Sequence, residues 1–137
     1  MIVTTKLLHT QIKHKMVENE KLVIISTIGD ENPEKATLPF VLATAAQASD
    51  VDVVVILQSN AVVLAKHGEA ETVNAKDFMP LKDLLEAYVS SGGKLLICSP
   101  CLKARTISKE ELIIGSSIIA AGTVVSEVMS AKSVVTY

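Results

Sequence analysis

Both cysteines of this 137-residue chain lie in the stretch GGKLLICSPCLKAR, residues 92–105, as Cys98 and Cys101. The thiolate form of cysteine is the nucleophile and the metal ligand. Two thiols at this spacing therefore fit four kinds of site: a dithiol redox pair, half of a metal site, a sulfur-carrying nucleophile with an assisting thiol, or two small buried hydrophobic residues.

The chain offers few partners for a metal site. A zinc ion needs about four protein ligands, and besides the two cysteines only three histidines are present, His9, His14 and His67. We therefore predict no metal and no cofactor. A thioredoxin-like redox pair is a further alternative, although that motif normally follows an early strand, whereas here it follows the third of five expected strands.

The residues after Cys98 favour an activated thiol. An ordinary cysteine is only a few per cent thiolate at neutral pH, and nearby positive charge or backbone N–H groups lower its pKa. Lys103 and Arg105 follow within seven residues. Pro100 allows the chain to turn after Ser99, so that free amides point toward the Cys98 sulfur. We expect a lowered pKa at Cys98 and an anion-binding role for these neighbours.

The surrounding pattern alternates strands with helices. Continuous apolar runs predict five strands, at residues 21–27, 51–59, 94–98, 117–121 and 133–137. Helices are expected from Asn32-Pro33 to about residue 49, from Pro80 to Gly92-Gly93, at 108–111 behind a capping box, and at 123–131. Residues 60–77 are ambiguous. The order predicts a three-layer α/β sandwich with a mainly parallel five-stranded sheet.

In such a sheet the binding groups gather beyond the carboxyl ends of the strands. Asp30, Ser59, Asn60 and the Cys98-Ser99 pair all fall there. Asn60 and Ser99 are therefore candidate substrate-binding residues. His67 lies in a polar loop and is a further candidate for lining the pocket, against the alternative of a solvated or capping histidine.

Composition limits the classes of partner. The formal net charge is −2 and the pI is about 5.9, so no basic surface for nucleic acid is expected. Hydrophobic residues make up 49% of the chain and the mean hydropathy is +0.41. A domain this apolar is expected to hide part of its surface against copies of itself.

Residues 1–20 are interpreted as an N-terminal extension, and residues 21–137 as a single domain. The extension is charged and lacks an apolar core, which is not the pattern of a secretory signal. The longest uncharged run, residues 112–126, is too short for a transmembrane helix and is broken by glycines. We therefore expect no transmembrane segment. We expect a cytoplasmic protein without a lasting disulfide.

The stretch LLICSPCLKARTISKEEL, followed by GSSIIAAGTVVSEVMSAKSVVTY, resembles the DsrE/DsrF/TusD-like sulfur-relay family over residues 21–137. In that family a cysteine follows the third strand, and a basic segment and a capped short helix come next. Cys98 stands at the position of that cysteine and Arg105 at that of the arginine. Two positions depart from the family pattern: Thr106 replaces a glycine, and so does Ala61.

The resemblance implies a sulfur carrier or sulfurtransferase that holds a persulfide or thiosulfonate on Cys98. Lys103 and Arg105 would stabilise the bound anion, and Cys101 would release the sulfur or shield it. The partners would be sulfur donor or acceptor proteins, or small anions such as thiosulfate, and the assembly a homotrimer or homohexamer. The alternatives are a non-catalytic binding or assembly protein of the same fold and a CxxC dithiol redox protein.

Overall fold

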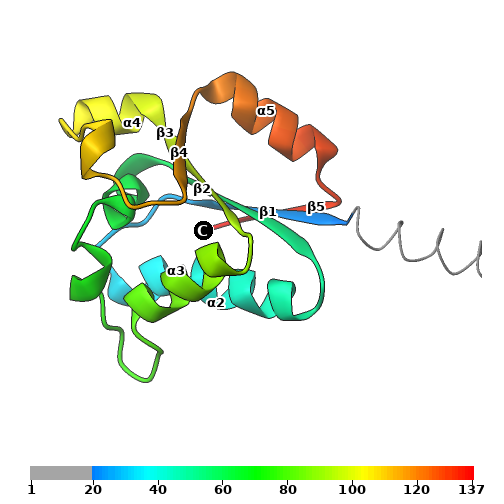
Figure 1. The fold of residues 1–137 in the computed structure, drawn as a ribbon, viewed down its shortest axis with the longest axis horizontal. Helices are drawn as coiled ribbons and strands as arrows, with labels where there is room; N and C mark the ends of the chain where they lie inside the picture. The colour runs from blue at the N-terminus through cyan, green and yellow to red at the C-terminus, as the bar shows by residue number, and fades with distance from the viewer. Residues whose placement is uncertain (1–19) are drawn as a thin grey trace, which may run out of the picture.

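The computed structural model describes residues 20–137. Five strands form one sheet, and every neighbouring pair is parallel, in the order β4-β3-β2-β1-β5 (Figure 1). The strands are β1 Lys21–Ser26, β2 Asp52–Leu57, β3 Lys94–Cys98, β4 Ser116–Ile119 and β5 Ser133–Thr136. All five lie within one or two residues of the predicted runs, and the sheet is wholly rather than mainly parallel.

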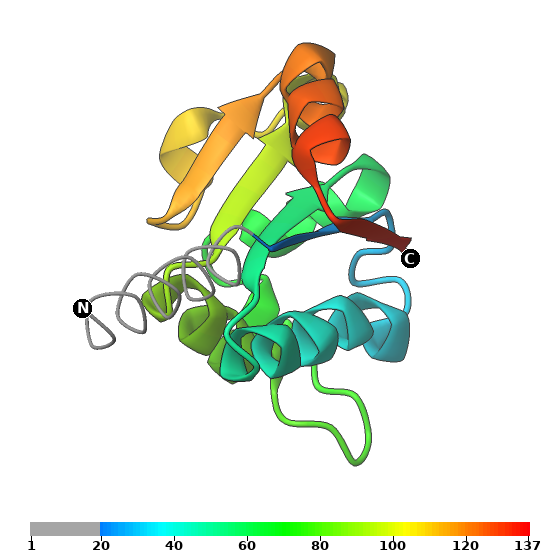
Figure 2. The same cartoon turned by 90° about the vertical axis from the view of Figure 1, so that its right-hand side faces the viewer.

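Helices cover both faces of this sheet. Helices α2 (Pro33–Ala48) and α3 (Leu81–Ser90) lie on one face, and α5 (Ala121–Ser130) lies on the other (Figures 1 and 2). The predicted three-layer α/β sandwich is therefore confirmed. Residues 60–77, which the sequence left ambiguous, lie in the short 3-10 helices η1 (Ser59–Ala65) and η2 (Ala70–Thr72) and the turns beside them.

Local capping signals explain where the helices begin and end. The side chain of Asn32 accepts a hydrogen bond from the Lys35 N–H at 3.1 Å, and Pro33 opens α2, as predicted. Pro39 lies inside α2 without delaying its start. Ser108 and Glu111 form the expected capping box of η3 (Lys109–Glu111).

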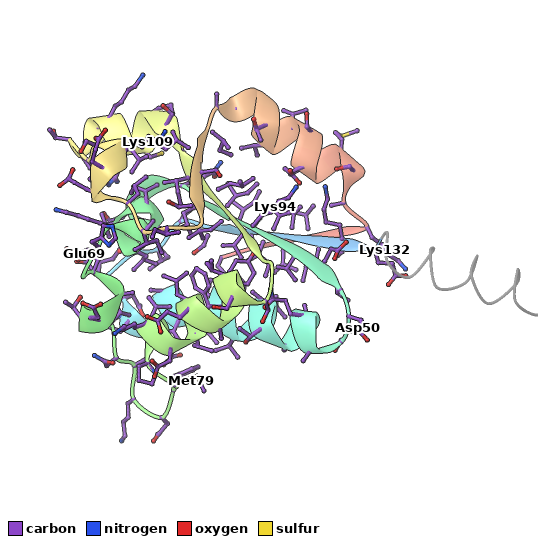
Figure 3. All side chains as sticks on the ribbon, viewed as in Figure 1. Asp50, Glu69, Met79, Lys94, Lys109 and Lys132 are labelled. Atoms are coloured by element: carbon purple, nitrogen blue, oxygen red, sulfur yellow. The ribbon has the colours of Figure 1, made fainter. Side chains whose placement is uncertain are left out.

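The larger hydrophobic core lies between the sheet and the α2–α3 layer. Side chains crowd this space in Figure 3. Phe40 of α2 and Tyr88 of α3 belong to this core, and their rings meet edge to face with centroids 5.9 Å apart. A smaller core lies beneath α5 and is built from Val23, Val54, Ile56 and Leu96. Successive side chains of the strands thus point alternately into one core and the other, as expected for a sheet buried on both faces.

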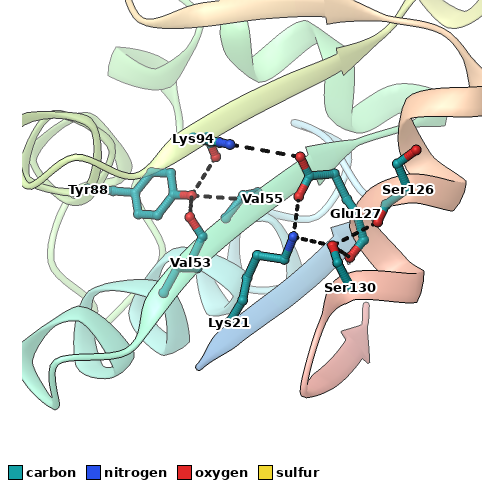
Figure 4. A network of polar contacts seen from close by, with 8 residues as sticks. All are labelled: Lys21, Val53, Val55, Tyr88, Lys94, Ser126, Glu127 and Ser130. Atoms are coloured by element: carbon teal, nitrogen blue, oxygen red, sulfur yellow. Dashed lines mark hydrogen bonds and ion pairs between the residues drawn. The ribbon is translucent and has the colours of Figure 1, made fainter. Parts of the chain in front are cut away.

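Tyr88 fixes α3 to the amino-terminal half of two strands (Figure 4). Its hydroxyl accepts a hydrogen bond from the Val55 N–H at 3.1 Å and lies within bonding distance of the carbonyl oxygens of Val53 and Lys94. Burial raises the pKa of the Tyr88 phenol, so it stays protonated and donates. Gly93 leaves room for the ring, because a Cβ there would lie 2.3 Å from it.

An ion pair holds α5 to the opposite face. The Glu127 carboxylate lies 2.8 Å from Lys21 Nζ and 3.9 Å from Lys94 Nζ, so it joins α5 to β1 and β3 (Figure 4). Glu127 is 15% exposed, so its charge is partly shielded from water. No helix within residues 20–137 combines the length and the apolar content needed to cross a bilayer. The predicted extension, 1–20, lies outside the described residues except for Glu20.

Candidate functional site

The two thiols come together where β3 ends. Cys98 is the last residue of β3, and helix α4 (Ser99–Ala104) begins at once, with Cys98 as its N-cap. The predicted turn after Ser99 is therefore the first turn of a helix, and Pro100 is accommodated because the first helical N–H groups need no intrahelical partner. One helical turn brings Cys101 back over Cys98, and the two sulfurs lie 2.9 Å apart.

Burial acts against the expected activation of Cys98. Both cysteines are free and half-buried. Burial raises the pKa of the Cys98 thiol, and the neighbouring Cys101 side chain raises it further, whereas the Cys101 backbone N–H and the charge of Arg105 lower it by less. The expectation of a lowered pKa at Cys98 is therefore wrong, although the amide and the cation that it invoked are both present.

Arg105, the C-cap of α4, is held beside this pair. Its Nη1 donates to the Cys101 carbonyl oxygen at 3.1 Å, and its Nε donates to Asn60 Oδ1 at 3.2 Å. Asn60 belongs to η1, which follows β2. The structure therefore brings together four of the predicted site residues from two separate stretches of chain: both cysteines and Arg105 from the β3–α4 segment, and Asn60 from η1.

The remaining predicted residues lie differently. Ser99 is half-buried at the start of α4, and Lys103 is exposed on the same helix. His67 is exposed and lines a different cavity of about 270 Å³, together with Leu85 and Val89 of α3. The prediction that His67 lines the cysteine pocket is therefore corrected, because the polar loop carries it past the end of η1 and onto the α3 layer.

Two further residues complete the site. The Ser59 N–H donates a hydrogen bond to Cys101 Sγ at 3.2 Å. Glu31, after β1, accepts from Asn60 Nδ2 at 2.8 Å, and this bond holds the pKa of the Glu31 carboxyl below its ordinary value. Both residues follow strand ends, the signal that predicts Ser59 at this edge and that would also have found Glu31. Neither has a residue type or spacing that marks it out by itself.

The described residues hold no obvious metal site. Residues 20–137 contain no group of three or more His, Cys, Asp or Glu side chains arranged to bind a metal ion. His9 and His14, which the zinc alternative required, lie outside those residues. The described residues bring two thiols, backbone amides and one guanidinium group to the site.

Comparisons with known proteins agree with this architecture. The structure is similar to the crystal structure of the ychN protein from E. coli, with a TM-score of 0.73 and 25% identity over 86% of this chain and 99% of that one. It shares its fold with MTH1491, a protein of unknown function from Methanobacterium thermoautotrophicum, with a TM-score of 0.70, 13% identity and coverage of 86% and 99% of the two chains.

Two curated relatives come from Methanocaldococcus jannaschii, and both are uncharacterized proteins. MJ0760 is 31% identical over 111 residues, which are 81% of this chain but only 40% of that relative's length. MJ0989 is 26% identical over 117 residues, which are 85% of this chain and 99% of the relative. The model of the DsrE/DsrF-like family matches residues 20–137, which are all the residues that the structure describes. This chain belongs to the DsrE/DsrF-like family.

Proposed function

We propose that this protein carries sulfane sulfur on Cys98 and passes it to an acceptor in a cytoplasmic sulfur relay. The observation that carries the proposal is the close thiol pair, with sulfurs 2.9 Å apart, at the carboxyl edge of the sheet beside Arg105. Membership of the DsrE/DsrF-like family supports it.

The chemistry balances without a cofactor. The Cys98 thiolate attacks the outer sulfur of a donor persulfide, the donor leaves as its thiolate, and Cys98 becomes a persulfide. With tetrathionate, the Cys98 thiolate attacks an inner sulfur, thiosulfate leaves, and Cys98 carries an –S–SO₃⁻ group. Arg105 would bind the anionic end of either donor, and Lys103 would add positive charge from the exposed side of α4.

A mass measurement tests this function. The reduced protein is incubated with polysulfide, thiosulfate or tetrathionate at a mildly alkaline pH, since the Cys98 pKa is raised, and its intact mass is recorded. We expect a discrete adduct, about 32 Da for a persulfide, that is transient in the wild type, persists in Cys101→Ser and is absent in Cys98→Ser. If neither the wild type nor Cys101→Ser, which cannot release the sulfur by forming a disulfide, gains mass with any of the three donors, the relay function is wrong.

Dithiol redox chemistry is the second candidate, and the same short distance between sulfurs favours it. It predicts a loss of about 2 Da on oxidation, with equal dependence on Cys98 and Cys101 and no added sulfur. A non-catalytic binding protein of the same fold predicts neither change.

We also propose that the protein assembles as a homotrimer or homohexamer. Large apolar side chains face solvent in the single chain: Ile114 is 92% exposed, Met129 80% and Val125 60%. Such exposure favours association with further copies. Light scattering coupled to size exclusion measures the mass directly, and a monomer at micromolar concentration would contradict the assembly.

A further inference from the structure

Three loops that follow different strands meet beside the cysteine pair. Glu31 comes after β1, Asn60 after β2, and Arg105 at the end of the helix that follows β3. The sequence predicts Asn60 and Arg105 as site residues, but not Glu31. Glu31 Oε1 accepts two hydrogen bonds, from the Gly29 N–H at 2.6 Å and from Asn60 Nδ2 at 2.8 Å.

These bonds decide which way the Asn60 amide faces. Its NH₂ group donates to Glu31 and, at 3.3 Å, to Asp30 Oδ1, so that its carbonyl oxygen is turned toward Arg105 Nε at 3.2 Å. An amide has its donor and its acceptor at opposite ends. The reverse orientation would set NH₂ against the guanidinium and the carbonyl oxygen against two carboxylates, so the charges on either side hold the amide in this orientation.

The backbone keeps the three loops in register. A Cβ on Gly29 would lie only 2.3 Å from the Asn60 carbonyl oxygen, so the loop after β1 packs directly on the main chain of η1. Arg105 has a second anchor, from Nη1 to the Cys101 carbonyl oxygen at 3.1 Å. A guanidinium has five N–H donors, and these two contacts engage two of them, one on Nε and one on Nη1.

We propose that Glu31 is a positioning residue: through Asn60 it holds the Arg105 guanidinium beside the Cys98–Cys101 pair, where it binds the anionic group of an incoming reagent. This inference deepens the proposed sulfur transfer and rests on it for the identity of the physiological anion. Glu31 is itself negative, and its charge by itself would repel an anion. It is exposed, however, so solvent screens that repulsion, and its orienting effect prevails.

Alkylation of Cys98 by two reagents of like reactivity separates these effects. Iodoacetate is an anion and iodoacetamide is neutral, and both attack the same thiolate, so the ratio of their rates cancels changes in the thiol pKa. The measurement uses the full chain carrying Cys101→Ala, which leaves one thiol and retains the backbone carbonyl that Arg105 contacts. Arg105→Leu is expected to lower the iodoacetate-to-iodoacetamide ratio about threefold, the effect of one partly exposed charge.

Variants of Glu31 and Asn60 then give the decisive comparison. Glu31→Leu and Asn60→Leu are expected to lower the ratio as Arg105→Leu does, whereas Glu31→Gln, which keeps an acceptor oxygen without the charge, retains at least the original ratio. Adding Glu31→Leu to Arg105→Leu should change nothing further. In a Lys103→Leu background, by contrast, Glu31→Leu should keep its full effect. Lys103 is a cation of the same helix, but it takes no part in the hydrogen bonds that join Glu31, Asn60 and Arg105.

Three results would overturn the inference. They are an unchanged ratio in Glu31→Leu, a raised ratio in Glu31→Leu, which would mean that charge repulsion dominates, and a loss that persists when Arg105 is already Leu. Failure of the sulfur relay is distinguishable from these results. A chain that gains no sulfur from any donor, but whose alkylation ratio depends on Glu31 through Arg105, lacks the relay function and retains the positioning residue.

Discussion

The backbone N–H of Ser59 donates a hydrogen bond to the sulfur of Cys101 at 3.2 Å. This contact joins the start of η1, after β2, to the first turn of α4, after β3. It gives the two thiols different surroundings: Cys101 receives an amide from another loop, whereas Cys98 ends a buried strand and is subject to the cost of burial. The cysteines of the CxxC motif are therefore chemically unequal.

Cys98 should be alkylated with a pH midpoint above that of the same cysteine in the urea-unfolded chain. A raised pKa means a smaller thiolate fraction at neutral pH, so the rate keeps rising into the alkaline range. Cys101→Ala removes one of the causes of the increase and should move the Cys98 midpoint back toward lower pH. Rates of iodoacetamide labelling, resolved by peptide mass, check both. A folded midpoint below the unfolded one would contradict the burial argument.

Cys101 should resolve a persulfide formed on Cys98. Its thiolate attacks the inner sulfur, hydrosulfide leaves, and a Cys98–Cys101 disulfide remains, a step that the 2.9 Å separation favours. In Cys101→Ser the adduct of about 32 Da should therefore persist, while the wild type should release about one sulfide per chain. Intact mass and a sulfide assay follow both products. Equal adduct lifetimes in the two proteins would leave Cys101 with a shielding role only.

Gly93→Ala should destabilise the fold, whereas Gly122→Ala should not. The added methyl at 93 would lie 2.3 Å from the Tyr88 ring, and three backbone groups hold that ring in place. We expect a loss of about 1–3 kcal/mol in the free energy of unfolding. Gly122, in the first turn of α5, has nothing within 4 Å of the added Cβ, so alanine should be neutral or gain up to about 1 kcal/mol. Urea denaturation of the pair provides its own control.

Glu127→Gln should loosen α5. It removes the charge that pairs with Lys21 at 2.8 Å, and the expected loss is about 1 kcal/mol, larger at low salt because screening weakens the pair in the wild type. Lys82→Gln is the control, since its pairs with Glu71 and Glu86 are long, at 3.9 and 4.0 Å, and more exposed. Urea midpoints at two salt concentrations measure both. A salt-independent loss at Glu127 would point to packing instead of charge.

The sequence by itself determined what depends on near neighbours along the chain. Apolar runs predict all five strands, and Asn32-Pro33 and the capping box at Ser108 predict helix starts. The helix α4, which sets Cys101 one turn after Cys98, was not predicted. The carboxyl-edge rule also predicts that Asn60 lies near the cysteines. These features follow from backbone geometry and local hydrogen bonding.

Only the tertiary structure decided what each side chain meets across the sheet edge. It sets Ser59 against Cys101, links Glu31 to Arg105 through Asn60, and carries His67 away to the α3 layer. It also reverses the expected pKa shift of Cys98, because nearby cations can be read from the sequence, whereas the loss of solvent around a sulfur depends on how the elements pack. Contacts between loops that lie about 30 to 45 residues apart depend on strand order and loop packing, which no short stretch of sequence encodes.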